Sequence, residues 1–177
     1  MEWVDTPDDA QLLPSRFLYK WKYNQDGVAF RQKSRVVVQG FHEADTGADK
    51  AAPVASQESV HLLVAHAAKH GLLLRQAYIR TSFLHDRVPS TAKAVYVIPP
   101  KGFECASEQA KQVWRLKAWL FGWRLSPREL YGILNVYLLK IGFAPSPADP
   151  CLYILDARKV LIVVYVDDIM LSGSDEE

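Results

Sequence analysis

Aromatic residues occupy every second position of one early segment of the chain: Phe17, Tyr19, Trp21 and Tyr23. An alternation with period two predicts a β-strand, with the aromatic side chains on one face and Lys20 and Lys22 on the other. Residues 24–27 read Asn-Gln-Asp-Gly, which is typical of a turn. Residues 28–38 predict a second strand that returns beside the first as a hairpin.

The returning strand carries three cations at alternate positions, Arg31, Lys33 and Arg35, so all three are predicted to share one face. Two interpretations fit this basic hairpin equally well. It is either an ordinary solvated surface or a contact surface for nucleic acid or nucleotide phosphate.

Two helices are predicted from apolar stripes and capping residues. The first follows Ser56, a good N-cap, and ends at Gly71. The second begins with the capping box Ser126-Pro127-Arg128-Glu129 and ends near Gly142.

Shorter apolar runs between and after the helices predict further strands, and residues 81–85 predict a helical turn. The predicted strands span residues 72–79, 94–98, 113–116, 151–155, 160–166 and 169–171, and residues 143–150 are expected to form a loop. This order of elements predicts an α+β fold: a mainly antiparallel sheet with helices packed on one face.

The last two of these strands meet at Asp167-Asp168, so two acids interrupt an otherwise apolar run. Burying such charges without a partner would cost several kcal/mol. A divalent cation such as Mg2+ would supply the partner, because it prefers carboxylate and phosphate oxygens. Neighbouring strand residues point to opposite faces, so at least one more ligand is expected from elsewhere.

Composition agrees with a globular chain: 49% of the 177 residues are apolar and 23% are charged. No apolar run is long enough to span a bilayer and no signal peptide is evident, so we expect an intracellular protein, cytoplasmic or nuclear, without a membrane partner. Cys105 and Cys151 lack the spacing of a zinc site and are expected to be idle thiols.

The net charge of +1 conceals segregated patches. Residues 15–42 contain six bases and one acid, residues 111–140 contain six bases and one acid, and residues 165–177 contain five acids and no base. A charged ligand would respond to these local patches rather than to the total.

Five segments of the chain carry recognisable motifs: Lys33-Ser34-Arg35-Val36-Val37-Val38-Gln39-Gly40-Phe41, Ala52-Pro53-Val54, Leu120-Phe121-Gly122-Trp123-Arg124-Leu125-Ser126-Pro127-Arg128, Asp149-Pro150-Cys151-Leu152-Tyr153 and Tyr165-Val166-Asp167-Asp168. Together, and nearly in order, they resemble the copia-type (Ty1/copia) retrotransposon reverse transcriptases. The last segment is similar to the polymerase signature of reverse transcriptases in general.

The resemblance implies a role for each predicted site residue. Asp167 and Asp168 would be catalytic, metal-binding carboxylates for Mg2+, of which the family uses two ions. The residues that bind the incoming nucleotide would be Lys33, Arg35, Phe83 and Leu125. The cations that contact the nucleic acid would be Lys20, Lys22 and Arg31.

The third catalytic carboxylate of the family has no counterpart here, because Tyr78 occupies its place in the segment from Gln76 to Leu84. A phenol with an ordinary pKa of about 10 is neutral at pH 7 and is a poor ligand for Mg2+. Leu125 also replaces a glutamine of the family. The sequence therefore predicts a crippled or inactive catalytic centre.

Two functions follow from these residues. The first is a partial RNA-directed DNA polymerase that works on an RNA template, a DNA primer and deoxynucleoside triphosphates by two-metal nucleotidyl transfer. Residues 1–177 would be the partial domain, with about 13–55 as the fingers hairpin, 56–177 mainly as the palm, and the thumb and RNase H region absent. The alternative is a non-catalytic nucleic-acid-binding or interaction module left from a degenerate retroelement.

Overall fold

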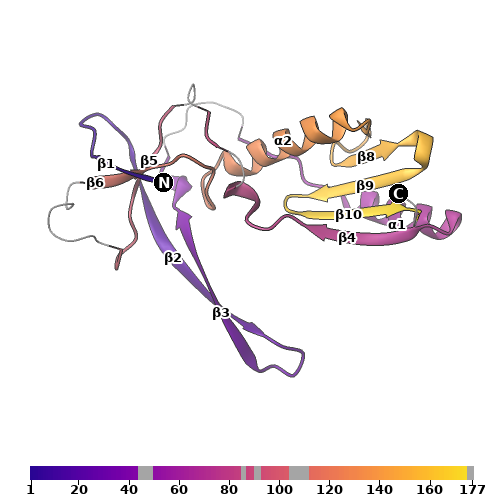
Figure 1. The fold of residues 1–177 in the computed structure, drawn as a ribbon, viewed down its shortest axis with the longest axis horizontal. Helices are drawn as coiled ribbons and strands as arrows, with labels where there is room; N and C mark the ends of the chain where they lie inside the picture. Colours follow the sequence, from indigo (N-terminus) through magenta and orange to yellow (C-terminus); the bar gives the residue numbers. More distant parts are fainter. Residues whose placement is uncertain (44–49, 85–86, 90–92, 104–111, 175–177) are drawn as a thin grey trace. The chain divides into compact units, whose positions relative to one another are not determined.

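The computed structural model describes residues 1–43, 50–84, 87–89, 93–103 and 112–174. The chain forms two compact units, each built around one five-stranded sheet (Figure 1). The first unit comprises residues 1–49 and 83–126, and the second comprises residues 50–82 and 127–177. Cys105, Lys111 and the acids at 175–177, like the end of the helical turn at His85, fall outside the described residues.

The first sheet has the strand order β1-β6-β5-β2-β3. Its strands are β1 (Glu2–Asp5), β2 (Leu12–Tyr23), β3 (Ala29–Val38), β5 (Tyr96–Ile98) and β6 (Gln112–Arg115), and only the β2–β5 pair is parallel. A 3-10 turn, Gly40–His42, follows β3. The predicted hairpin is confirmed, with Gly27 in the turn at a φ of 76°.

The second sheet has the order β4-β10-β9-β8-β7. Its strands, all paired antiparallel, are β4 (Leu73–Tyr78), β7 (Ala144–Pro145), β8 (Leu152–Leu155), β9 (Val160–Tyr165) and β10 (Asp168–Gly173). Two further 3-10 turns are Ser82–Leu84 and Asp156–Arg158. β7 is a correction, because residues 143–150 were expected to form a loop throughout.

Both predicted helices are present, α1 at Gln57–His70 and α2 at Ser126–Lys140. The Ser56 hydroxyl accepts a hydrogen bond from the Ser59 amide at 3.1 Å, and Gly71 ends α1 with a φ of 65°. No described helix is long and apolar enough to cross a membrane.

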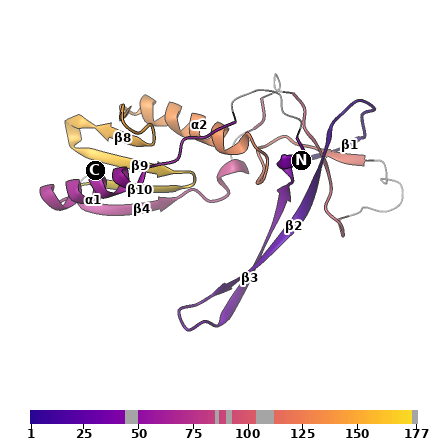
Figure 2. The ribbon, with the colours of Figure 1, turned by 180° about the vertical axis from the view of Figure 1, so that it is seen from behind.

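The second sheet is covered on both faces, not on one as the sequence led us to expect (Figures 1 and 2). Leu138 of α2 packs with Val160, Ile162 and Val164 of β9. Leu63 of α1 packs with Leu161 and Val163, the alternate residues of β9, whose side chains point to the opposite face of the sheet. Double-sided burial explains why β9 is apolar without interruption. The α+β class is confirmed.

Candidate functional site

The acidic pair lies at the tight turn between β9 and β10. Tyr165 ends β9, Val166 and Asp167 form the turn, and Asp168 begins β10. Val166 has a φ of 57°, a conformation that a β-branched residue adopts only with strain, of about 1–3 kcal/mol. Asp167 is half-buried and Asp168 is exposed.

Tyr78 lies directly beside this pair. Strand β4 runs antiparallel to β10, and its last residue, Tyr78, is in register with Asp168. The pairing continues past the end of the strand, because the Ile79 amide donates to the carbonyl of Asp167 at 2.9 Å. The position that the resemblance assigns to a third carboxylate is therefore a cross-strand neighbour of Asp168, where Cβ atoms are about 5 Å apart.

A row of three side chains, Tyr165, Asp168 and Tyr78, crosses the sheet at this level. Asp168 is paired with Tyr165 on one side and with Tyr78 on the other, so all three share the face that α1 covers. The tyrosines are 52% and 49% exposed. A recess of about 190 Å³ lies against Asp168 on the same face, with Val163 and Met170 in its floor.

The turn offers fewer carboxylate oxygens than two magnesium ions require. Magnesium is held by carboxylate and phosphate oxygens, and a neutral phenol does not replace a carboxylate. Among the described residues, no group of three or more His, Cys, Asp or Glu side chains could hold a metal ion. Two aspartates and a tyrosine do not fit a site for two ions.

The predicted nucleotide-binding residues belong to the first unit. Lys33 and Arg35 lie on β3, where register places Lys33 opposite Lys20 and Arg35 opposite Leu18. Phe83 is buried in the 3-10 turn Ser82–Leu84. Leu125 is half-buried just before α2.

Phe121 contacts two of these residues, although it had appeared only within a family motif and without a role of its own. The guanidinium carbon of Arg35 lies 5.1 Å from the centre of the Phe121 ring, within cation–π range. The Phe83 ring meets the same ring edge-on, with centroids 4.9 Å apart. Arg35 and Phe83 thus both contact the ring of Phe121.

Glycines allow the loop that carries Phe121 to lie against the end of β3. The Val38 amide donates to the Phe121 carbonyl at 2.8 Å, and the Gly40 amide donates to the Gly122 carbonyl at 3.2 Å. A Cβ atom on Gly122 would overlap the carbonyl of Val38, and one on Gly40 would overlap the carbonyl of Gly122. Gly122 also has a φ of 83°.

The three predicted nucleic-acid contacts lie on the outer part of the hairpin. Lys20 pairs with Lys33 and Lys22 pairs with Arg31, so two like-charged pairs face each other directly. Such pairs destabilise a hairpin unless an anion lies close by. The predicted common face of these cations is confirmed by the register.

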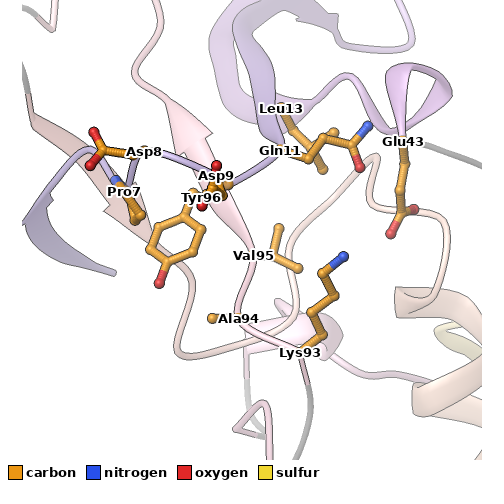
Figure 3. A pocket seen from close by; sticks show the side chains of 11 residues that line it. Pro7, Asp8, Asp9, Gln11, Leu13, Glu43, Lys93, Ala94, Val95 and Tyr96 are labelled. Carbon is orange, nitrogen blue, oxygen red and sulfur yellow. The ribbon is translucent and has the colours of Figure 1, made fainter.

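The first unit also contains a cavity of about 490 Å³ that holds none of the predicted site residues (Figure 3). Lys93 extends toward the side of the cavity where Glu43 lies. One carboxylate oxygen of Glu43 accepts a 3.4 Å hydrogen bond from the Trp123 indole, and the other is buried with no hydrogen-bond partner in the part of the chain that the structure describes. The sequence offered no signal for this cavity.

The comparison with known families agrees with the motifs. The family described as "Reverse transcriptase (RNA-dependent DNA polymerase)" matches residues 1–177. The chain belongs to the reverse transcriptase family. A "Retrovirus-related Pol polyprotein from transposon RE1" of Arabidopsis thaliana is 32% identical over 174 residues, and the corresponding protein of transposon RE2 is 30% identical. Both alignments cover 96% of this chain.

A third relative, the "Retrovirus-related Pol polyprotein from transposon TNT 1-94" of Nicotiana tabacum, is 28% identical over 98% of the chain. The chain spans 12 to 13% of the length of these polyproteins. No solved structure gives a significant match. The family match and the three transposon relatives confirm the resemblance to copia-type reverse transcriptases.

Proposed function

We propose that this chain is the fingers and palm portion of a copia-type RNA-directed DNA polymerase whose catalytic centre has lost one of its three carboxylates. The first unit would act as the fingers and the second as the palm. The observation behind the proposal is the register of β4 and β10, which pairs Tyr78 with Asp168. Removing one charge from a two-metal site costs several kcal/mol of transition-state stabilisation, and so several orders of magnitude in rate.

Under this proposal the first unit would still bind the incoming nucleotide. Arg35 and Lys33 would meet the triphosphate of an incoming nucleotide, with Phe83 beneath its sugar and Leu125 nearby. The Arg35–Phe121 contact supports this role, because it orients the guanidinium without neutralising its charge. Binding of template, primer and nucleotide is therefore expected to outlast the loss of catalysis.

Metal binding tests the proposal without relying on activity. We expect the Tyr78→Asp variant to bind Mn2+ roughly tenfold or more tightly than the unmodified chain, measured by electron paramagnetic resonance. Tyr78→Phe is the matched control, because it keeps the ring and adds no carboxylate. Equal Mn2+ affinity of all three proteins would contradict the proposal.

Primer extension with Mg2+ or Mn2+ provides the second arm. We expect no template-dependent synthesis by the unmodified chain. Robust synthesis would overturn the proposed defect, whatever the metal measurements show. If Tyr78→Asp in a chain extended by a thumb and an RNase H region still gave no synthesis, a further defect would lie outside position 78.

A second candidate function is a non-catalytic nucleic-acid-binding module. It is favoured by the two like-charged pairs on the hairpin, which a polyanion would stabilise. We expect salt-dependent binding of RNA and DNA through Lys20, Lys22 and Arg31, together with Lys33 and Arg35. Binding that is unaffected by charge reversal at Lys33 and Arg35 would contradict this function.

A further inference from the structure

The aromatic stripe, which we define as Phe17, Tyr19, Trp21 and Tyr23, follows one face of β2. Phe17 is half-buried, whereas Tyr19, Trp21 and Tyr23 are 64%, 52% and 60% exposed. The basic side chains occupy the alternate positions of the same strand, so they project from the opposite face. Three large rings therefore face outward in a row, which is more than the scattered exposed apolar residues of an ordinary surface.

The neighbouring strand places no bulky apolar residue directly in register with these rings. The residues of β3 in register with Tyr19, Trp21 and Tyr23 are Ser34, Gln32 and Ala29. All three register partners are small or polar, and the register shifts between Lys22 and Tyr23, where Phe30 of β3 adds a further exposed ring, 64% exposed. Beyond Pro14, β2 pairs only with β3 among the described strands (Figure 1).

The Phe17 end of the aromatic stripe is held in place by contacts with other rings. Phe17 packs against Phe103 with centroids 6.2 Å apart, and Tyr19 stacks on Phe17 at 5.6 Å with an interplanar angle of 26°. A ring held in place loses less conformational freedom when a ligand binds, which favours binding.

Charge indicates what kind of partner would lie against the stripe. Residues 15–42 carry six bases and one acid, Asp26. Strands of the hairpin are about 4.8 Å apart, so long Lys and Arg side chains on the back can reach around a two-stranded ribbon to its edges. A partner with flat apolar rings and a polyanionic backbone would use both faces, and unpaired nucleic acid has both features.

We propose that the aromatic stripe is a stacking surface for the bases of single-stranded nucleic acid, and that it gives the hairpin a preference for single strands over duplex. The cations would bind phosphates of either form, whereas only unpaired bases can stack on Tyr19, Trp21 and Tyr23. This inference rests on the proposed binding of nucleic acid by the hairpin and adds to it the form of nucleic acid that is bound.

Fluorescence of Trp21 provides a direct test. Trp114, Trp119 and Trp123 are buried and Trp3 is half-buried, so Trp21 is the one exposed indole of the five. We expect a 20-nucleotide oligo(dT) or oligo(rU) to quench its emission and protect it from acrylamide, and a duplex of equal length to do neither. Trp21→Ala should abolish the quenching.

Affinity measurements separate stacking from charge. We expect Tyr19→Ala and Tyr23→Ala each to weaken single-strand binding at least about fivefold and to leave duplex binding unchanged. Trp21→Phe, which keeps a ring, should retain most of the affinity. Tyr137→Ala, at an exposed tyrosine of α2 in the other unit, is the matched control and should change neither affinity.

Three results would contradict the stacking surface. Alanine variants that bind single strands normally, while Lys20→Glu with Lys22→Glu abolishes binding, would overturn the stacking surface and leave nucleic-acid binding intact. No binding of either form at low salt would overturn both proposals. A concentration-dependent dimer that Trp21→Ala disperses would assign the stripe to a second copy of the chain and overturn the stacking surface.

Discussion

Asp149 is a buried carboxylate that ties α1 to the start of β8. It accepts hydrogen bonds from the Ser56 amide at 2.9 Å, the Ser59 hydroxyl at 2.6 Å and the Cys151 amide at 2.8 Å. Burial acts to raise the pKa of Asp149, but these hydrogen bonds outweigh it and the pKa lies below its ordinary value. The sequence showed Asp149 only as part of a family motif, because two of its three partners, Ser56 and Ser59, lie about ninety positions away.

Asp149→Asn should lower the stability of the second unit by about 2 kcal/mol at pH 7, since an amide cannot accept all three hydrogen bonds. A pKa lowered by folding adds stability above the ordinary pKa of aspartate, and this stability is lost as the pH falls through the lowered value. The variant should therefore lose less stability between pH 7 and pH 3 than the unmodified chain.

Helix ellipticity during urea unfolding measures this effect, because α1 and all but the first residue of α2 belong to the second unit. Asp156→Asn, at an exposed aspartate of the neighbouring turn, is the control and should change little. Equal pH dependence of Asp149→Asn and the unmodified chain would contradict the assigned role.

Cys151 should be chemically inert in the folded chain. Its side chain is 1% exposed, and burial, with the charge of Asp149 nearby, raises the pKa of the thiol to about 11. In a Cys105→Ser background we expect no reaction with Ellman's reagent at pH 8 until the protein is unfolded. Rapid labelling of the native variant would contradict this expectation.

At the scale of elements, the sequence was most informative where local chemistry decides the structure. Capping residues predicted both helices, and the turn at 24–27 predicted the long hairpin. The faces on which the helices pack depend on contacts between distant segments. Even so, the unbroken apolar run of β9 is a sign of burial on both faces that the prediction of single-sided packing overlooked.

The loop at residues 120–126 depends on glycine more than any sequence pattern indicated. Gly122→Ala should destabilise the first unit by about 3 kcal/mol, because it adds a steric clash with Val38 to the cost of a positive φ. Gly102→Ala, at a φ of 86° with nothing within 4 Å, should show the φ cost alone, about 1–2 kcal/mol.

Tryptophan emission during unfolding measures this difference, because all five tryptophans belong to the first unit. If Gly122→Ala and Gly102→Ala lowered the free energy of unfolding equally, the loop would move away from β3 without a loss of stability. A larger loss at Gly122 would support close packing as the reason for glycine there.

At the scale of the whole molecule, the two units interleave along the chain, with crossings after residues 49, 82 and 126. Sequence reasoning divides a chain into successive segments, so it could not foresee that residues 83–126 return to the sheet of the hairpin. The acidic pair and the tyrosine in place of the third acid were predicted from the sequence, because all three residues lie in segments that resemble family motifs.

Nucleic-acid binding by a chain of net charge +1 should nevertheless depend steeply on salt. If the five hairpin cations at positions 20, 22, 31, 33 and 35 each contact a phosphate, a plot of log affinity for a single strand against log salt should have a slope of about −3.5. Lys20→Gln combined with Lys22→Gln should reduce the slope by about 1.4. A slope near zero would contradict contact through these cations.

The like-charged pairs of the hairpin have a second consequence, for the behaviour of the protein at high concentration. β3 is the edge strand of its sheet, and beyond Pro14 the outer edge of β2 has no strand partner among the described residues. Open strand edges beside exposed aromatic rings favour pairing between copies and aggregation, and lysines on such edges oppose it. Replacing Lys20 and Lys33 by threonine would relieve repulsion within one hairpin and, by the same change, remove its protection against fibril-like assembly.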